Sequence, residues 1–184
     1  MTRPHPASIA AILLLVAVAI ILWTMGRPPI CTCGTVELWG QVGPEQSQML
    51  ADWYSPSHFI HGLVFYALLW RFAGKQSIER RFLIAVVVEA AWEIMENTSL
   101  VIDRYREATM ALGYSGDTIL NSMSDIAMMA LGFLAARRLP VWASVALVIG
   151  LELLTLAIIR DNLTLNVWML LWPTDAIRLW QAGA

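Results

Sequence analysis

Charged residues are scarce in this chain, and their scarcity restricts its class. Only 14% of the 184 residues are Asp, Glu, Lys or Arg, whereas 58% are hydrophobic, and the mean hydropathy is +0.62. A soluble domain of this size could not cover its surface with so few polar groups. The composition therefore predicts an all-α, multi-pass membrane protein whose single domain, residues 1–184, has the lipid bilayer as its main partner.

The chain also lacks the signatures of several functions. No basic cluster or alternation of basic and aromatic residues indicates nucleic-acid binding. No Ser-His-Asp order and no glycine-rich phosphate loop is present, so covalent catalysis has no support. An internal repeat, which is typical of many transporters, is not evident either. These absences favour a non-covalent enzyme or a binding protein over a transporter.

Apolar runs predict about five transmembrane helices in one bundle, at residues 7–25, 57–73, 82–102, 117–136 and 141–159. Each is about long enough to cross the hydrocarbon core. A cleaved signal peptide is the rival reading of the first run, but Arg27, Pro28 and Pro29 follow it where a small-residue cleavage site is expected. Residues 163–172 are too short to cross alone. They predict a C-terminal re-entrant or interfacial helix, with a tilted sixth span as the alternative.

Basic residues in the short connections set the expected orientation. The pairs Arg80–Arg81 and Arg137–Arg138 lie in the connections after the second and fourth predicted spans. By the positive-inside rule these connections are cytoplasmic. The N-terminus is then cytoplasmic as well, and residues 26–55 form a loop on the outer, periplasmic face.

Three glutamates interrupt the third apolar run. Glu89, Glu93 and Glu96 are offset by four and seven residues, which brings their carboxyl groups within roughly 60° of one another on an α-helix. Each would cost about 2.5–3.5 kcal/mol or more at the centre of a lipid-exposed helix. This acidic stripe is therefore expected to face protein, water or a metal, and its three carboxyl groups are candidate catalytic acid–base groups.

Polar residues of four predicted spans are expected to meet in the outer leaflet. His58 and His61 open the second span one helical turn apart, and Asp117 and Asp125 lie at the start of the fourth. Under the predicted orientation both pairs lie near the outer face, as does the outer end of the acidic stripe. We therefore predict one polar pocket in the outer leaflet. Two further polar residues are assigned to it: Asn121 and Glu152.

So many carboxylates at close quarters need compensation, because like charges raise one another's pKa. A divalent metal, an arginine from an outer loop, or retained protons would provide it. An oxygen-rich site suits Mg²⁺ or Mn²⁺ more than Zn²⁺, for which the histidines are the usual ligands. The candidate metal ligands are His58, His61, Glu93, Asp117 and Asp125. The alternative is that these groups cap helices and hydrogen-bond between them.

The two cysteines, Cys31 and Cys33, lie in the predicted periplasmic loop, which is an oxidising environment. One intervening residue makes a disulfide between them strained, and two thiolates alone are an incomplete zinc site. They are expected to pair with each other, with metal binding beside a histidine and no role at all as the alternatives.

Four stretches of the sequence resemble an uncharacterised family of bacterial inner-membrane proteins of unknown function. They are Cys31-Thr32-Cys33-Gly34, Ser55-Pro56-Ser57-His58-Phe59-Ile60-His61-Gly62, Trp92-Glu93-Ile94-Met95-Glu96-Asn97-Thr98 and Gly116-Asp117-Thr118-Ile119-Leu120-Asn121-Ser122. The order S-x-x-H, Glu93-x-x-Glu96 and Asp117-x-x-x-Asn121 also resembles, more distantly, the VanZ-like teicoplanin-resistance group. The resemblance covers about residues 30 to 130. It implies a multi-pass protein of the bacterial inner membrane and brings no established activity.

The sequence thus favours an enzyme, a hydrolase or transferase, that acts on a lipid-linked or amphipathic substrate at the outer leaflet. In that hypothesis the histidines and aspartates hold a divalent metal together with Glu93, and Glu89 or Glu96 handles protons. Two alternatives stay open. One is a non-enzymatic binding or transport protein for a cation or a polar head group, and the other is a helix bundle whose polar groups only fix its packing.

Overall fold

The computed structural model of the chain describes residues 6–43, 45–109 and 113–183, and within these ranges it is all helical, with no strand. The helices are α1 (Pro6–Thr24), α2 (Ser55–Phe72), α3 (Ile78–Glu96), α4 (Ser99–Ala108), α5 (Ile119–Arg138), α6 (Val141–Ile159), α7 (Leu163–Leu171) and α8 (Asp175–Ala182). The all-α prediction is confirmed.

Polar residues at the helix starts explain several of these bounds. The Ser77 side chain accepts a hydrogen bond from the Arg80 amide at the start of α3, and Thr118 does the same for the Asn121 amide at the start of α5. Pro56 lies in the first turn of α2, where its missing N–H costs nothing. The Ser77 and Thr118 side chains thus each accept from a backbone amide that has no partner within its own helix.

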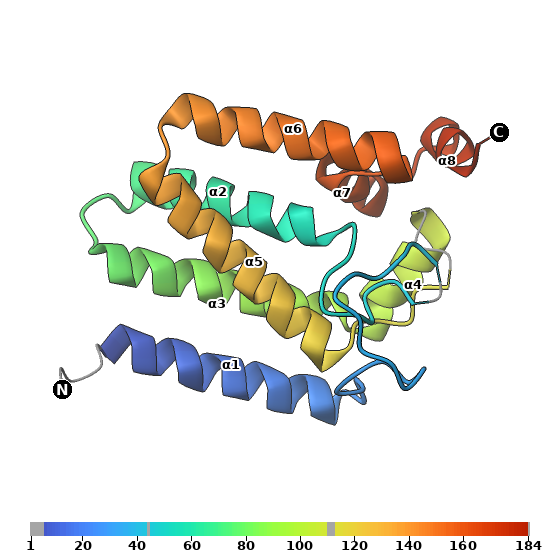
Figure 1. Cartoon of the computed structure of the whole chain (residues 1–184), viewed down its shortest axis with the longest axis horizontal. Coiled ribbons are helices and arrows are strands. Elements are labelled where there is room, and N and C mark those ends of the chain that lie inside the picture. The colour runs from blue at the N-terminus through green and yellow to red at the C-terminus, as the bar shows by residue number, and fades with distance from the viewer. Residues whose placement is uncertain (1–5, 44, 110–112, 184) are drawn as a thin grey trace.

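The five long helices α1, α2, α3, α5 and α6 form a bundle, and the long loop between α1 and α2 lies at one end of it together with α4, α7 and α8 (Figure 1). Helix α5 crosses between its neighbours and packs against α2 and α3. The apolar core lies between α1, α3 and α5, with Phe133 fully buried between the rings of Tyr66 and Phe82. Most of the buried polar side chains lie toward the loop end of the bundle.

Helices α2 and α5 touch through their backbones at two glycines. A Cβ atom at Gly62 would lie 2.0 Å from the Met129 carbonyl oxygen, and one at Gly132 would lie 2.0 Å from the Phe59 carbonyl oxygen. Neither backbone can retreat without separating the two helices. The missing side chains therefore fix how closely α2 and α5 approach.

The number of helices fit to cross a membrane is lower than predicted. Of the described helices, only α5 and α6 are both long and apolar enough to span a bilayer, and the apolar helix over residues 9–24 is shorter. Helix α3 fails because it carries Glu79, Arg80 and Arg81 as well as the acidic stripe. The prediction of five spans is thus supported for two helices.

The third predicted span also ends earlier than expected. One continuous helix was expected over residues 82–102, but α3 stops at Glu96 and α4 is a separate helix. Asn97 is the C-cap residue of α3, and its side-chain amide donates to the Glu93 carbonyl oxygen at 2.9 Å. Thr98 is extended, with φ −76° and ψ 150°. The short helix expected over residues 163–172, as a re-entrant or interfacial element, is present as α7, and a further helix, α8, follows it.

The glycine contact between α2 and α5 predicts a selective loss of stability. Gly62→Ala and Gly132→Ala should each lower the free energy of unfolding by about 1–3 kcal/mol or more, because the added methyl group overlaps backbone atoms. Gly150→Ala in α6 is the matched control, since a Cβ atom there meets nothing within 4 Å, and alanine favours a helix by up to about 1 kcal/mol over glycine. Thermal unfolding of the three purified variants measures the difference; equal midpoints would contradict it.

Candidate metal centre

His58 of α2 lies among carboxylates from α3 and α5. Its Nδ1 atom is 2.7 Å from Glu89 Oε1 and 3.4 Å from Glu93 Oε1, and its Nε2 atom is 3.8 Å from Asp125 Oδ2. The short Nδ1 contact to Glu89 favours the tautomer with its proton on Nδ1. The lone pair of Nε2 then faces Asp125. The histidines and carboxylates gathered here are called the cluster below: His58, His61, Glu89, Glu93, Glu96, Asp117 and Asp125.

His61, one turn further along α2, contacts the same glutamate. Its Nδ1 atom is 3.1 Å from both Glu89 oxygens, and its ring stacks on Phe65 with centroids 5.7 Å apart. Glu89 is 0% exposed, so the two imidazoles are its polar surroundings in place of water. His58 and His61 thus hold the inner end of the acidic stripe.

Glu93 is buried without a hydrogen-bond partner. The residue is 0% exposed, and neither of its carboxylate oxygens has a hydrogen bond of normal geometry among the described residues, although the Ser122 hydroxyl lies near them. Its nearest charged neighbour is His58, whose Nδ1 is already engaged with Glu89. A buried polar group left unpaired costs free energy, so the Glu93 carboxyl group needs a cation or a proton.

Asp117 and Asp125 bring the oxygen atoms of α5 to the same place. Asp125 Oδ1 accepts a hydrogen bond from the Ser55 hydroxyl at 2.9 Å. Asp117, just before α5, accepts from the Tyr114 hydroxyl at 2.9 Å and from the Asn97 amide at 2.7 Å. Each aspartate therefore has its position fixed by a neutral donor.

No lysine or arginine of the described residues compensates this negative charge. Within the described ranges, the cluster's carboxylates form ion pairs only with His58 and His61. Three arginines at the loop end of the bundle are engaged elsewhere: Arg27 donates to the Ser115 carbonyl oxygen, Arg104 to that of Leu170 and Arg106 to that of Tyr114. Of the three predicted forms of compensation, a cation and retained protons are left.

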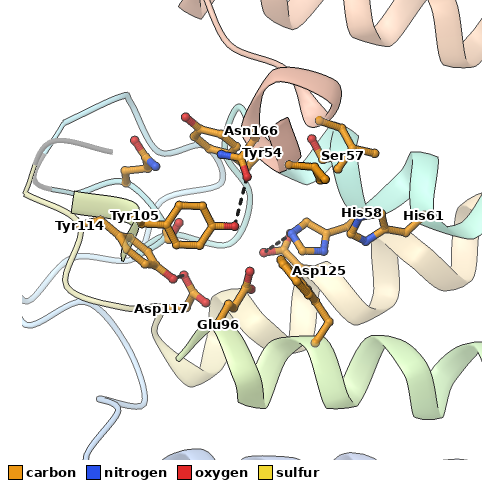
Figure 2. Close-up of a pocket in the computed structure, with 15 residues that line it drawn as sticks. Tyr54, Ser57, His58, His61, Glu96, Tyr105, Tyr114, Asp117, Asp125 and Asn166 are labelled. Atoms are coloured by element: carbon orange, nitrogen blue, oxygen red, sulfur yellow. Dashed lines mark hydrogen bonds and ion pairs between the residues drawn. The ribbon is translucent and has the colours of Figure 1, made fainter. Parts of the chain in front are cut away.

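Five members of the cluster line a pocket of about 60 Å³ at the loop end of the bundle: His58, His61, Glu96, Asp117 and Asp125. This volume is enough for more than one water molecule, and the fully buried Glu89 and Glu93 are not among the lining residues. Figure 2 shows Glu96, Asp117, Asp125 and His58 directed toward the same space. Its wall also contains apolar and aromatic side chains, from Trp92 of α3 to Leu163 and Val167 of α7. Tyr105, Tyr114 and Asn166 complete the polar rim. The pocket thus has carboxylate groups on its floor and both apolar and polar side chains on its wall.

Three groups of side chains in this cluster have the geometry to hold a metal ion. They are His58, His61 and Glu89; His58, Glu93 and Asp125; and Glu93, Glu96 and Asp117. In each group one ligand atom per residue lies within 4.8 Å of the others. The structure therefore brings together seven of the nine residues that the sequence assigned to the pocket.

The other two assigned residues have structural contacts. The Asn121 amide donates to the Met49 carbonyl oxygen at 3.0 Å, which ties the long loop to α5, although its Oδ1 atom is buried without a partner. Glu152 does not line the pocket. Its carboxylate accepts from the amides of Leu163 and Thr164 at 3.0 and 3.1 Å, so it caps the start of α7.

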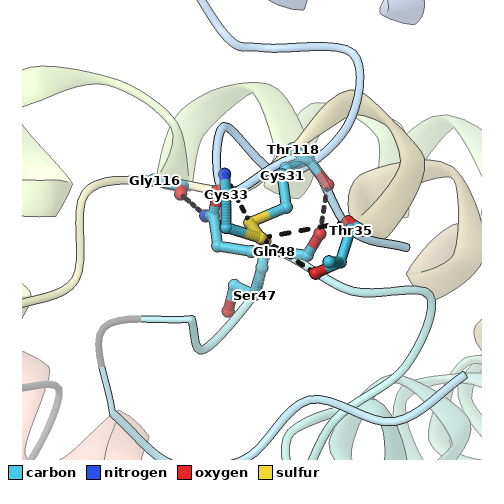
Figure 3. The surroundings of a disulfide bond; sticks show 7 residues. All are labelled: Cys31, Cys33, Thr35, Ser47, Gln48, Gly116 and Thr118. Carbon is cyan, nitrogen blue, oxygen red and sulfur yellow. Dashed lines mark hydrogen bonds between the residues drawn. A yellow bond between two sulfur atoms is a disulfide. The ribbon is translucent and has the colours of Figure 1, made fainter. Parts of the chain in front are cut away.

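The long loop is fastened to the start of α5 beside the pocket. The amides of Thr118, Ile119 and Leu120 donate to loop carbonyl oxygens of Ser47, Pro28 and Pro29. Cys31 and Cys33 form a disulfide bond, which is the pairing expected from the sequence. Figure 3 shows this bond near Gln48 and Thr118. The pair is therefore not available as metal ligands.

Three residues that hold the aspartates were not expected from the sequence: Asn97, Tyr114 and Ser55. Asn97 bonds twice to Asp117, since its Oδ1 also accepts from the Asp117 amide at 2.8 Å. One signal was present, because Asn97 follows Glu93 by four residues and so lies at the end of the acidic stripe. The contact with Asp117 depends on the tertiary fold.

The fold and the site together define a class of protein: an α-helical bundle with a buried pocket of carboxylates and imidazoles at one end. A family model described as "Protein of unknown function (DUF2585)" matches residues 22–183. The chain belongs to this uncharacterised bacterial family, whose members are also named UPF0314 proteins. The resemblance to a family of unknown function is confirmed.

Close relatives cover nearly the whole chain. A UPF0314 protein of Paracoccus denitrificans is 58% identical over 184 aligned positions, covering 99% of this chain and 95% of the relative. UPF0314 proteins of Novosphingobium aromaticivorans and Agrobacterium fabrum are 52% and 54% identical, covering 96% and 94% of this chain and 92% and 88% of their own lengths. No solved structure matches. The distant resemblance to VanZ-like proteins is not confirmed by these comparisons.

The contacts of Asn97 predict that it stabilises the pocket. Asn97→Ala should lower the free energy of unfolding by about 1–3 kcal/mol, because the buried Asp117 carboxyl and amide groups each lose a hydrogen-bond partner. Ser99→Ala, two residues away and exposed, should change it by no more than about 0.5 kcal/mol. Thermal unfolding of both variants tests this, and a stable Asn97→Ala protein would show that Asp117 does not depend on Asn97.

Proposed function

We propose that this protein is a multi-pass protein of the bacterial inner membrane, with its pocket in the outer leaflet. There it binds a divalent cation and catalyses metal-assisted hydrolysis or transfer on a lipid-linked or amphipathic substrate. The observation that carries the proposal is the buried Glu93 carboxyl group. It makes no hydrogen bond of normal geometry among the described residues, yet it lies within 4.8 Å of ligand atoms of His58 and Asp125.

Exposed apolar side chains on the outside of the bundle support the membrane part of the proposal. In α6, only Thr155 is buried, and large apolar side chains of α1 and α6 face outward. They include Ile12, Leu13, Val16 and Ile20 of α1 and Val145, Ile149, Leu153 and Leu154 of α6. Apolar surface of this extent on a soluble monomer would be an unusual liability. A bilayer around these helices would cover this apolar surface. In that arrangement α1, α2 and α3 would cross the membrane together with α5 and α6.

The donor set supports a divalent cation in the pocket. Carboxylate oxygens outnumber imidazole nitrogens, which suits Mg²⁺ or Mn²⁺. His58 adds a nitrogen ligand of the kind that Zn²⁺ also accepts. Glu89 holds the Nδ1 atom of His58. Metal-binding histidines commonly have their other ring nitrogen held by a carboxylate in this way. Such a cation would offset the negative charge that no basic side chain of the described ranges reaches.

The pocket wall supports an amphipathic substrate. Leu163 and Val167 line the pocket, and the neighbouring Trp168 of α7 is exposed, so an apolar chain could lie beside α7 while its polar head faces the acids. Hydrolysis would join a water oxygen to the ester carbon or phosphorus and break its bond to the alcohol. Glu96, which lines the pocket, would accept the water's proton and return it to the leaving alcohol.

The proposed orientation predicts which cysteines a membrane-impermeant maleimide reaches in intact cells. Cys33 is exposed, so after reduction with an impermeant phosphine it should be labelled from outside. In a Cys31→Ser, Cys33→Ser background, Lys75→Cys in the connection between α2 and α3 should be labelled only after the inner membrane is permeabilised. The reverse pattern would overturn the orientation, and extraction of the whole protein by alkaline carbonate would overturn the membrane assignment.

The cation part of the proposal predicts bound metal that depends on Glu93. Purified wild-type protein equilibrated with Mn²⁺ and then desalted should retain at least one ion per chain by elemental analysis, and Glu93→Gln should lose it. The matched control is Glu107→Gln, because Glu107 is an exposed glutamate of α4. Metal-free wild-type protein, or undiminished metal in Glu93→Gln, would contradict the proposal.

The same samples separate an enzyme from a binding protein. Long-chain alcohol esters and phosphoesters in detergent micelles are the substrates to offer, with alcohol release as the measurement. Turnover by the Mn²⁺-loaded wild type but not by Glu93→Gln supports catalysis. A fully loaded protein that releases no alcohol from any of them favours the alternative, binding or transport of a cation or polar head group.

A further inference from the structure

We infer that the pocket binds two divalent cations, bridged by the Glu93 carboxylate. This inference rests on the proposed function and specifies the site further. It follows from the way the ligand groups overlap. His58, Glu93 and Asp125 form one triad and Glu93, Glu96 and Asp117 form another, so Glu93 is the residue that the two share.

The first triad is a mixed nitrogen and oxygen site. His58 offers Nε2, because Glu89 occupies its Nδ1 at 2.7 Å. Asp125 Oδ2 lies 3.8 Å from that Nε2, a separation that two ligands of one metal ion have, and Asp125 Oδ1 is held by Ser55. Both ligands are thus oriented by neighbours before a cation arrives, as in other metal sites. This site accepts Mn²⁺ or Zn²⁺.

The second triad is built from oxygen alone. Asp117 is held by Tyr114 and Asn97 through hydrogen bonds of 2.9 and 2.7 Å, and Glu96 lines the pocket from the last turn of α3. Three carboxylates without a nitrogen ligand suit Mg²⁺ or Mn²⁺. Burial of all three residues makes them costly as neighbouring bare anions.

Glu93 has what a bridging ligand requires. Both of its oxygens are buried and without hydrogen-bond partners among the described residues, so one is free for each cation. Its neighbours in the two triads come from different helices, Asp125 from α5 on one side and Glu96 from α3 on the other. Carboxylate-bridged ions in two-metal sites lie about 3.5–4 Å apart and act together on the attacking and leaving oxygens of a displacement.

The test is the number of Mn²⁺ ions per chain and their magnetic coupling. Wild-type protein in detergent, titrated with Mn²⁺, should bind two ions, and its electron paramagnetic resonance spectrum should show the broadening of a coupled pair. Glu96→Gln and Asp125→Asn each alter one triad and should each retain one ion with an uncoupled spectrum. Glu107→Gln should match the wild type, and unfolding midpoints of the metal-free variants show whether each is folded.

The outcomes separate this inference from the proposed function. One ion per wild-type chain, lost in Asp125→Asn but kept in Glu96→Gln, would overturn the second site and leave the proposed function standing. Two ions without coupling would overturn the bridging role of Glu93. No bound ion in a folded wild-type protein would overturn both.

Discussion

Negative charge buried between α2, α3 and α5 is the constraint on which the rest of the structure depends. An ionised carboxylate taken out of water costs several kcal/mol unless a partner compensates it. The imidazoles compensate Glu89, and neutral donors hold Asp117 and Asp125. Glu93 has no hydrogen bond of normal geometry among the described residues, and its nearest imidazole, that of His58 at 3.4 Å, is already engaged with Glu89. The same helices that pack the apolar core at one end must therefore keep an acidic pocket intact at the other.

The close contact of α2 and α5 gives this pocket its geometry. Because Gly62 and Gly132 have no side chains, the two backbones touch. The N-terminal ends of α2 and α5 are therefore held near each other. Ser55 therefore reaches Asp125, and His58 lies between Asp125 and the acidic stripe of α3. Ligands fixed in this way by packing and hydrogen bonds are pre-organised, which is what a metal site needs.

The sequence predicted the parts of this arrangement that depend on local pattern. Helical spacing placed Glu89, Glu93 and Glu96 on one face, and the apolar runs located the five long helices. It could not predict the end of α3, because Asn97 is held there partly by Asp117, twenty residues further on. Nor could it assign Glu152, whose partners are the amides of α7. Contacts between distant segments decided both, and a single sequence contains no record of them.

The acidic stripe that the sequence presents as one unit is divided by depth in the structure. Glu89 is enclosed and shared by two imidazoles, so it lies behind the proposed metal ligands, where it orients His58. Glu96 lines the pocket and is the stripe's member nearest to a substrate. Glu93 lies between them. In the proposed site, Glu89 orients His58, Glu93 bridges the two cations, and Glu96 binds the second cation through one oxygen and leaves the other to carry a proton.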